Sequence, residues 1–386
     1  MEIKNLITDI LRGTSEAINV ETLEKKLIAS SKSGKSLNIK AGFDPTAPDI
    51  HLGHVVLLRK LRQLQDLGHK VFFLIGDFTA QIGDPTGRDQ TRKKIDQRQI
   101  KQNSKTYQKQ AFKILDLRKT KIVFNSSWLS KLSIQKMLEL TAYSTVAQML
   151  ARADFKKRAQ KANEITILEF IYPLLQGYDS VHLKADIELG GTDQRFNLLM
   201  GRQIQEAYGQ EPQAVIMTPL LEGTDGVQKM SKSLNNYIGI NESSKDIFGK
   251  IMSINDDLMY KYFEFLTDES LDVVRSLHPK EAKLLLAQRI VAQFYDENKA
   301  KEEKQDFDKV FSQHQLPEDM PEYDIKDQEQ LVDILLKNKF VESKNEVRRL
   351  IKQGAITHDG KKIGSEDFMV KKGVLKVGKR RFLKIK

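Results

Sequence analysis

Near its start the chain alternates strand and helix signals, and this order constrains the fold more than any other feature. "SLNIKAGF" (36–43) alternates apolar and polar residues, "HVVLLRKLRQLQDLG" (54–68) repeats leucine at helical spacing and ends at Gly68, and "KVFFLIGDF" (70–78) is a short apolar run. Strand, helix and strand in this order form a βαβ unit, whose strands are parallel. The pattern therefore predicts an α/β fold with a doubly wound parallel sheet.

Two later segments extend the predicted sheet and locate its binding edge. "ADIELGG" (185–191) and "AVIMTPL" (214–220) have strand patterns, and each runs into a glycine-containing loop. Because ligands of doubly wound sheets bind outside the carboxyl ends of the strands, we expect both loops to face one crevice. Residues 85–180 are polar with helical patterns, and we expect them to form a helical insertion in this domain.

The rest of the chain divides by composition into further domains. A length of 386 residues exceeds a single compact core. We expect a Rossmann-like domain at 1–242, a helical domain at 243–314 and a small α+β domain at 331–386. The segment 315–330 begins with "QLPEDMPEYD", whose prolines and acids are typical of a linker.

The net positive charge of the chain is concentrated in the last predicted domain. Residues 337–386 hold 16 Lys and Arg but 5 Asp and Glu, which equals the net charge of +11 of the whole chain. Within "ESKNEVRRLIKQG" (342–354), Ser343 and Glu346 form a capping-box signature. Lys344, Arg348 and Lys352 recur at i, i+4 spacing and line one face of this helix, and together with Arg349 they are the residues that we expect to bind phosphates. The domain therefore reads as a small folded module that binds a polyanion, rather than a merely soluble basic face.

The composition also bears on the cellular setting. The sequence contains no cysteine, which excludes disulfides and thiolate metal sites and suits a reducing compartment. No apolar run approaches the roughly 18 residues that span a bilayer. We expect a cytoplasmic protein with no membrane partner.

A loop near the middle of the chain carries two closely spaced lysines. "GTDGVQKMSKS" (223–233) places Lys229 and Lys232 three residues apart among glycines and short polar side chains, which give the loop little to pack. The pair is either part of a solvated surface turn or a site for a polyanion.

A histidine pair follows the first predicted strand. In "GFDPTAPDIHLGH" (42–54), His51 and His54 lie at the start of a helix, where free N–H groups and the helix dipole favour phosphate. Gly53, between them, lets a flat ring such as adenine approach the backbone. The histidines could instead only cap the helix, or bind a metal, although no third ligand is obvious nearby.

Two further groups of polar residues follow predicted elements. "LGGTDQRFN" (189–197) offers glycines for close approach and an acid and an amide that suit a ribose or an ammonium group. Tyr172, Gln176 and Asp179 lie at i, i+4 and i+7, on one face of a helix. They can converge on one ligand, or form a polar helix face in water.

Together these motifs resemble the class I aminoacyl-tRNA synthetases, and among them the bacterial-type tyrosyl-tRNA synthetases. The likeness rests on "AGFDPTAPDIHLGH", "IGDPTGR", "YPLLQGYD", "GGTDQ" and "KMSKS", in that order, followed by a module like the RNA-binding domain first described in small-subunit ribosomal protein S-four. It covers nearly the whole chain. The resemblance implies an ATP-dependent ligase that forms tyrosyl-adenylate from L-tyrosine and transfers tyrosine to the 3′-terminal adenosine of tRNA(Tyr).

The resemblance also implies roles for individual residues. Catalysis would use His51, His54, Lys229 and Lys232, on the triphosphate. ATP would be bound by Asp44, Thr46, Gly53, Gly191, Asp193, Met230 and Ser231. Tyrosine would be bound by Gly42, Asp84, Tyr172, Gln176, Asp179 and Gln194, with Asp179 accepting the phenolic hydroxyl. Mg²⁺ would travel with ATP rather than occupy a dedicated protein site, tRNA would bind the basic module, and the inserted region would form a homodimer.

One position departs from the pattern of many bacterial relatives. They have a tyrosine two residues before the glycine of the first motif, where it contacts the phenol of the substrate, and this chain has Lys40. Recognition of the hydroxyl would then rest on Asp179 and on groups that the sequence does not identify.

Three other functions compete with this interpretation. A tryptophanyl-tRNA synthetase shares the fold and reaction but would not normally carry the basic module. A nucleotidyltransferase with an HxGH motif lacks the lysine loop in this form. A catalytically silent RNA-binding protein would have no reason to keep both histidines and both lysines.

Overall fold

The computed structural model describes residues 3–86, 95–311, 320–325, 329–378 and 381–386. The chain separates into two compact units, Met1–Ala300 and Lys301–Lys386. No helix among the described residues is long and apolar enough to cross a membrane.

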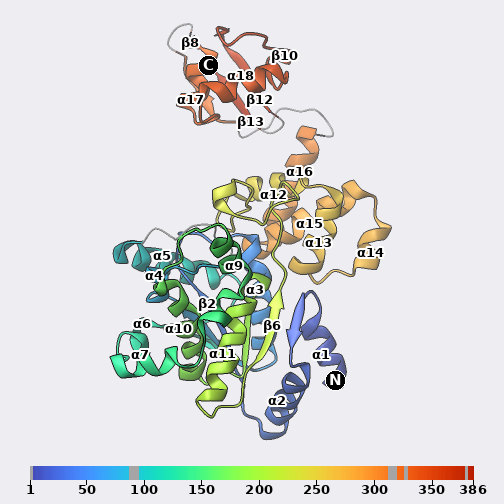
Figure 1. The fold of residues 1–386 in the computed structure, drawn as a ribbon. Coiled ribbons are helices and arrows are strands. Elements are labelled where there is room, and N and C mark those ends of the chain that lie inside the picture. The colour runs from blue at the N-terminus through green and yellow to red at the C-terminus, as the bar shows by residue number, and fades with distance from the viewer. Residues whose placement is uncertain (1–2, 87–94, 312–319, 326–328, 379–380) are drawn as a thin grey trace. The chain divides into compact units, whose positions relative to one another are not determined.

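The larger unit is built on a six-stranded sheet in the order β1-β6-β5-β2-β3-β4. Strands β2 and β6 of this sheet are labelled in Figure 1. The strands are β1 (Glu16–Ile18), β2 (Asn38–Phe43), β3 (Lys70–Ile75), β4 (Thr120–Phe124), β5 (Ile187–Gly191) and β6 (Ala214–Thr218). The last five are parallel, which confirms the predicted doubly wound sheet, and β1 pairs antiparallel with β6. The edge strand β1 was not predicted, because three residues are too few to show a period.

Helices cover both faces of the sheet. Those that precede or connect the strands are α1 (Ile3–Leu11), α2 (Val20–Ser33), α3 (Leu52–Asp66), α4 (Thr79–Ile82), α5 (Gln97–Ala111), α6 (Ser126–Leu129), α7 (Ile134–Thr141), α8 (Val146–Leu150), α9 (Ala153–Gln160), α10 (Ile167–Leu183) and α11 (Arg195–Ala207). Short 3₁₀ turns lie at Leu117–Lys119, Thr192–Gln194 and Lys232–Leu234. The predicted helix at 54–68 is confirmed as α3, which buries its leucines on the sheet.

The chain reverses direction across the sheet after β4. It runs outward from β2 through β3 to β4, and then returns to β5, which lies on the other side of β2. Because parallel crossovers are right-handed, the outward helix α3 and the returning helices α10 and α11 lie on opposite faces. The carboxyl ends of β2 and β5 therefore diverge and leave a crevice.

The expectation of a helical insertion at 85–180 is wrong in part. The segment contains β4, which pairs with β3 as the edge of the sheet, and most of α10, which packs against β2. The strand was missed because "TKIVF" is short and only partly buried, so its apolar residues do not form a strong run. Residues 87–94, which include the end of "IGDPTGR", lie outside the described residues.

Helices predominate after the sheet, as predicted. They are α12 (Ser244–Met252), α13 (Asp256–Leu266), α14 (Leu271–Ser276), α15 (Pro279–Phe294) and α16 (Glu297–Phe311). The boundary between the two units falls within α16, whereas the helical domain was expected to extend to residue 314.

The smaller unit has its own sheet and core. Its elements are β7 (Glu322–Tyr323), β8 (Glu329–Gln330), α17 (Leu331–Lys337), α18 (Lys344–Lys352), β9 (Ile356–His358), β10 (Lys361–Lys362), β11 (Met369–Val370), β12 (Gly373–Val377) and β13 (Arg381–Ile385). The main sheet has the order β10-β9-β12-β13-β7, and β11 pairs with β8. Leu335, Val347 and Leu383 are among the buried residues that join both helices to the sheet.

The segment expected as a linker, 315–330, is structured in part. β7 pairs parallel with β13, and Glu322 forms ion pairs with Lys384 and Lys386. These contacts are distant in sequence, so the proline-rich composition did not reveal them. Residues 315–319 and 326–328 of the segment lie outside the described part of the chain.

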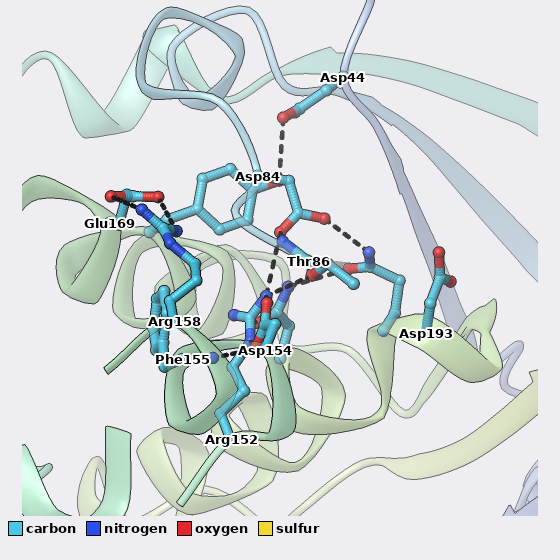
Figure 2. Close-up of polar contacts among 12 residues, drawn as sticks. Asp44, Asp84, Thr86, Arg152, Asp154, Phe155, Arg158, Glu169 and Asp193 are labelled. Atoms are coloured by element: carbon cyan, nitrogen blue, oxygen red, sulfur yellow. Dashed lines mark hydrogen bonds and ion pairs between the residues drawn. The ribbon is translucent and has the colours of Figure 1, made fainter. Parts of the chain in front are cut away.

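A buried ion pair fixes the start of α10. Arg158 on α9 is 1% exposed, and its Nη1 lies 2.6 Å from Oε1 of Glu169 (Figure 2). Glu169 also accepts from the N–H of Thr166 at 2.9 Å and closes the capping box of the helix. Burial raises the pKa of Glu169, but the bonds from Arg158 and Thr166 outweigh it, so the pKa is lowered.

We expect Arg158→Met to lower the free energy of unfolding of the larger unit by about 3 kcal/mol, because it leaves the Glu169 carboxylate buried without its cation. Denaturant unfolding can be followed through the fluorescence of Trp128, the only tryptophan. Arg118→Met is the matched control, since the Arg118 side chain is 90% exposed and solvent screens its pair with Asp116, so its loss should have little effect on stability. Equal effects of the two substitutions would contradict the role of the buried pair.

Candidate active site

A cavity of about 390 Å³ opens at the carboxyl ends of β2, β5 and β6. Of the seventeen residues predicted to be catalytic or to bind ATP or tyrosine, all line it except Lys232: Gly42, Asp44, Thr46, His51, Gly53, His54, Asp84, Tyr172, Gln176, Asp179, Gly191, Asp193, Gln194, Lys229, Met230 and Ser231. Residues from five separate motifs thus meet in one place. The site also contains Glu188, Tyr107 and Thr79, which were not predicted.

The two histidines form one wall at the N-terminus of α3. Nδ1 of His51 accepts from the N–H of Gly53 at 3.2 Å, and Nδ1 of His54 accepts from the N–H of His51 at 3.3 Å. The histidines therefore do cap the helix, and they also line the cavity. A side chain at Gly53 would meet the ring of His51 at 3.0 Å, so the glycine keeps this packing.

Both imidazoles are neutral near pH 7. Burial, with the adjacent His54 and Lys232, lowers the pKa of His51 to about 2, and burial lowers the pKa of His54 to about 4. Because Nδ1 accepts a hydrogen bond in each ring, the single proton lies on Nε2. The pair can therefore donate two hydrogen bonds to an anion without adding charge.

The lysine loop between β6 and the 3₁₀ turn at Lys232–Leu234 is more tightly held than its composition suggested. Met230 is buried, and the Asn236 side chain accepts from the N–H of Ser231 at 2.8 Å and donates to the carboxylate of Asp225 at 2.9 Å. The expectation of a loop with little to pack is wrong here, because the asparagine that fastens it lies beyond the motif.

Each lysine of the loop has a carboxylate partner. Nζ of Lys232 lies 2.5 Å from Oδ2 of Asp49, and Nζ of Lys229 lies 3.8 Å from Oδ2 of Asp193. The side chain of Lys229 is half exposed at the cavity mouth, and Lys232 lies just outside the lining. Both ammonium groups can reach an anion in the cavity by exchanging these partners.

A continuous chain of hydrogen bonds forms the deep end of the site. The hydroxyl of Tyr172 donates to Oδ2 of Asp44 at 2.9 Å, and the hydroxyl of Thr79 donates to Oδ1 of the same carboxylate at 2.8 Å. Thr79 accepts from Nδ2 of Asn125 at 3.1 Å, and this amide also donates to Asp179. Burial, with Asp44 next, raises the pKa of Tyr172, so its hydroxyl stays protonated.

Asp179 ends this chain in a buried position. The residue is 1% exposed, Nε1 of Trp128 donates to its Oδ1 at 2.8 Å, and Nδ2 of Asn125 donates to its Oδ2 at 3.2 Å. Burial raises the pKa of Asp179 to about 7. Asn125 and Trp128 follow β4, so the rule for strand ends would have located them if β4 had been predicted.

Polar groups converge around Asp84 (Figure 2). Oδ2 of Asp84 accepts from Nε2 of Gln194 at 2.7 Å, and Oδ1 accepts from the hydroxyl of Thr86 at 2.6 Å. Nη2 of Arg152 donates to the same hydroxyl at 2.7 Å and lies 3.8 Å from Asp84. Such a set of oxygens can bind an ammonium group. Among the described residues no three His, Asp or Glu side chains form a metal site.

The predicted RNA-binding residues lie on α18 of the smaller unit. Ser343 caps this helix by accepting from the N–H of Glu346 at 3.3 Å, whereas the Glu346 carboxylate accepts from Glu342 instead of closing the box on Ser343. Arg348 forms a two-bond ion pair with Glu366, while the side chain of Arg349 is 67% exposed. Lys344 and Lys352 are also exposed.

Comparisons with known proteins agree with the geometry of both units. The profile of tRNA synthetases class I (W and Y) matches residues 32–312, and that of the tyrosine–tRNA ligase SYY-like C-terminal domain matches residues 312–383. The chain is 52% identical to the tyrosine–tRNA ligase of Idiomarina loihiensis (100% of this chain, 98% of the relative) and 53% identical to that of Aquifex aeolicus (97% of each).

Solved structures share the fold of the larger part of the chain. The tyrosyl-tRNA synthetase of Archaeoglobus fulgidus complexed with L-tyrosine superposes with a TM-score of 0.64 at 22% identity, over 79% of this chain and 100% of that one. The truncated mitochondrial enzyme of Aspergillus nidulans gives the same TM-score over 79% and 94%. The chain therefore belongs to the tyrosine–tRNA ligases of the class I tRNA synthetase family.

Proposed function

We propose that this chain activates L-tyrosine with ATP, forming tyrosyl-adenylate and pyrophosphate, and then transfers tyrosine to the 3′-terminal adenosine of tRNA(Tyr). One observation carries the proposal: a single cavity joins neutral histidines and an ammonium group at its mouth to a buried aspartate at its deep end. The first part suits a triphosphate and the second suits a phenol.

The phosphate end supplies stabilisation rather than covalent chemistry. The tyrosine carboxylate attacks the α-phosphorus, and the bond from this phosphorus to the bridging oxygen of pyrophosphate breaks. Lys229 and Lys232 leave Asp193 and Asp49 for the β- and γ-phosphates, and neutralise the charge that grows on the departing pyrophosphate. Nε2 of His51 and His54 donate to the same phosphates. No enzyme nucleophile is required, so catalysis is positioning plus electrostatics.

Glycine and polar residues at the strand ends hold the rest of ATP. A side chain at Gly191 would lie 2.6 Å from the carboxylate of Asp193, so the absence of one lets the nucleotide approach the backbone beside this acid. Asp44, Thr46, Gly53, Met230 and Ser231 complete the ATP side. Mg²⁺ would enter with ATP, held by phosphate oxygens and its own waters, and would neutralise part of the triphosphate charge.

The deep end of the cavity recognises the ammonium group and the phenolic hydroxyl of tyrosine. The ammonium group binds among Asp84, Gln176 and the hydroxyl of Tyr172, with Gln194 holding Asp84 in place. Gly42 leaves room for the ring, and the phenolic hydroxyl donates to Asp179. Because Trp128 and Asn125 each donate to one oxygen of Asp179, the carboxylate form fits the site, and it retains lone pairs for the phenol.

The proposal extends to partners and location. The phosphates of tRNA bind to the exposed cations of α18, which are Lys344, Arg349 and Lys352, with Arg348 beside them. The protein acts in the cytoplasm. The chain forms a homodimer through the apolar surface of α7 and the start of α10, where Ile134 is 82% exposed, Leu138 65% and Ile167 79%. Side chains of this size and exposure at neighbouring helices are typical of a protein interface.

Pyrophosphate exchange with each of the twenty amino acids tests the activity directly. We expect ATP formation from labelled pyrophosphate with tyrosine and far less with every other amino acid, because a side chain that does not bring a donor to Asp179 leaves this buried acceptor unpaired. The family includes tryptophan enzymes, so tryptophan is the informative competitor. Faster exchange with tryptophan than with tyrosine would contradict the proposal.

Lys232→Ala should slow tyrosine activation about a hundredfold with little change in tyrosine affinity. The contact strengthens as pyrophosphate leaves, and the loss of one such preorganised donor costs about 3 kcal/mol in the transition state. The measurement is pre-steady-state adenylate formation, and Lys245→Ala, at an exposed lysine on α12, is the control. A normal rate in Lys232→Ala would remove this lysine from the mechanism.

Truncation after Phe311, at the end of α16, should preserve adenylate formation and abolish efficient charging of tRNA. The removed part includes residues 337–386, whose net charge of +11 equals that of the whole chain. In the full chain, Arg349→Glu with Lys352→Glu should raise KM for tRNA while leaving tyrosine activation unchanged. The KM of the parent should also rise steeply with salt, as phosphate contacts release counterions. Unaltered charging by the double variant would assign these residues another role.

A further inference from the structure

Lys40 occupies a position that no part of the mechanism above uses. It lies on β2, between β3 and β5, and is 0% exposed. Lysine is almost never fully buried unless it is paired. Nζ lies 2.9 Å from Oε1 of Glu188, 2.8 Å from the hydroxyl of Ser180 and 3.0 Å from the carbonyl oxygen of Gln176. The ammonium group therefore uses all three of its donors.

The partners of Lys40 connect it to the deep end of the site. Glu188 stands opposite Lys40 on β5 and lines the cavity. Its Oε2 accepts from the hydroxyl of Ser180 at 3.1 Å and from the side chain of Gln213. Gln176 and Ser180 bracket Asp179 on one turn of α10. Lys40 thus ties the turn that carries Asp179 to two central strands of the sheet.

Lys40 also affects the charge of Asp179. The ionisable groups that interact with Asp179 are Lys40 from β2, Glu188 from β5 and Tyr172 from α10 itself, while His182 stacks on Trp128 behind it. Burial raises the pKa of Asp179 to about 7, the cation of Lys40 opposes this rise, and Glu188 adds to it. Both neutral donors, Asn125 and Trp128, are bound to carboxylate oxygens.

We propose that Lys40 is a positioning residue for recognition of the tyrosine hydroxyl, because it fixes the Gln176–Ser180 turn against the sheet and favours the carboxylate form of Asp179. It acts through Asp179 and does not touch the substrate. The inference rests on the proposed tyrosine activation. At the position where many bacterial relatives have a tyrosine that contacts the phenol, this chain has Lys40. The lysine supports Asp179, the acceptor of the hydroxyl, without contacting the substrate itself.

The experiment compares kcat/KM of pyrophosphate exchange for tyrosine and phenylalanine across pH 5.5 to 9. The variants are Lys40→Met, Lys40→Met/Glu188→Gln and Lys26→Met. Lys26 is the matched control, because it is another buried lysine, 7% exposed, that pairs with Asp186 and Glu211 outside the site. Thermal unfolding of each variant measures stability separately from specificity.

In Lys40→Met we expect the tyrosine to phenylalanine ratio to fall about tenfold or more, the size of a lost hydrogen bond to a charged group. The loss should appear in KM for tyrosine rather than in kcat, because ground and transition states share the phenol contact. In the parent, kcat/KM for tyrosine should rise with pH near pH 7, where Asp179 loses its proton. In Lys40→Met this rising limb of the pH profile should move to higher pH, because the cation no longer lowers the pKa of Asp179. In the double variant it should move less, since Glu188 no longer raises the pKa of Asp179.

Lys26→Met should lower stability without changing the ratio or the limb. An unchanged ratio and limb in Lys40→Met, with an active parent, would overturn the inference and leave the proposed function intact. A parent that does not activate tyrosine would instead refute the proposed function. If Lys40→Met is too unstable to assay, the double variant decides, because it buries no unpaired charge. A tyrosine to phenylalanine ratio equal to that of the parent overturns the inference. A reduced ratio supports it.

Discussion

The reversal of strand order at β2 determines where the chemistry of the larger unit can occur. Right-handed crossovers place α3 on one face and α10 with α11 on the other, so the loops after β2 and β5 separate. The N-terminus of α3 then borders the crevice from one side, and the loops with Asp193 and Lys229 border it from the other. Most groups of the proposed mechanism come from the loops that follow the strands or from α10, and Asp84 follows the short helix α4.

Buried polar groups give this crevice a fixed shape. Trp128, Asp179, Asn125, Thr79 and Asp44 form one chain of hydrogen bonds that reaches the hydroxyl of Tyr172. Each member has partners, as buried polar groups require, and the low local dielectric strengthens every bond. The acid for the amino-acid hydroxyl and the acid on the ATP side are thereby held in one network, so the two halves of the site keep a constant separation.

Residues with a local signal could be predicted from the sequence, and residues fixed by distant contacts could not. The histidine pair, the lysine loop and the face of α10 each have a spacing that shows in a short window. Glu188 reads as one residue of an apolar strand, and its role depends on Lys40, which lies 148 positions earlier in the chain but directly opposite in the sheet. β4 and β7 escaped prediction for the same reason, because they are short edge strands defined by pairing.

Charge and hydrogen bonding are divided between different residues at the phosphate end. Burial is the main cause that lowers the pKa of both His51 and His54, and the nearby Lys232 lowers it further, so both imidazoles stay neutral beside the cation that is available to the triphosphate. Neutral donors on Nε2 can hold phosphate oxygens without repelling the lysines. The lysines in turn are balanced by Asp49 and Asp193, which limits the cost of gathering cations at one strand edge. A fully charged histidine pair would compete with the lysines for these carboxylates and would repel their ammonium groups.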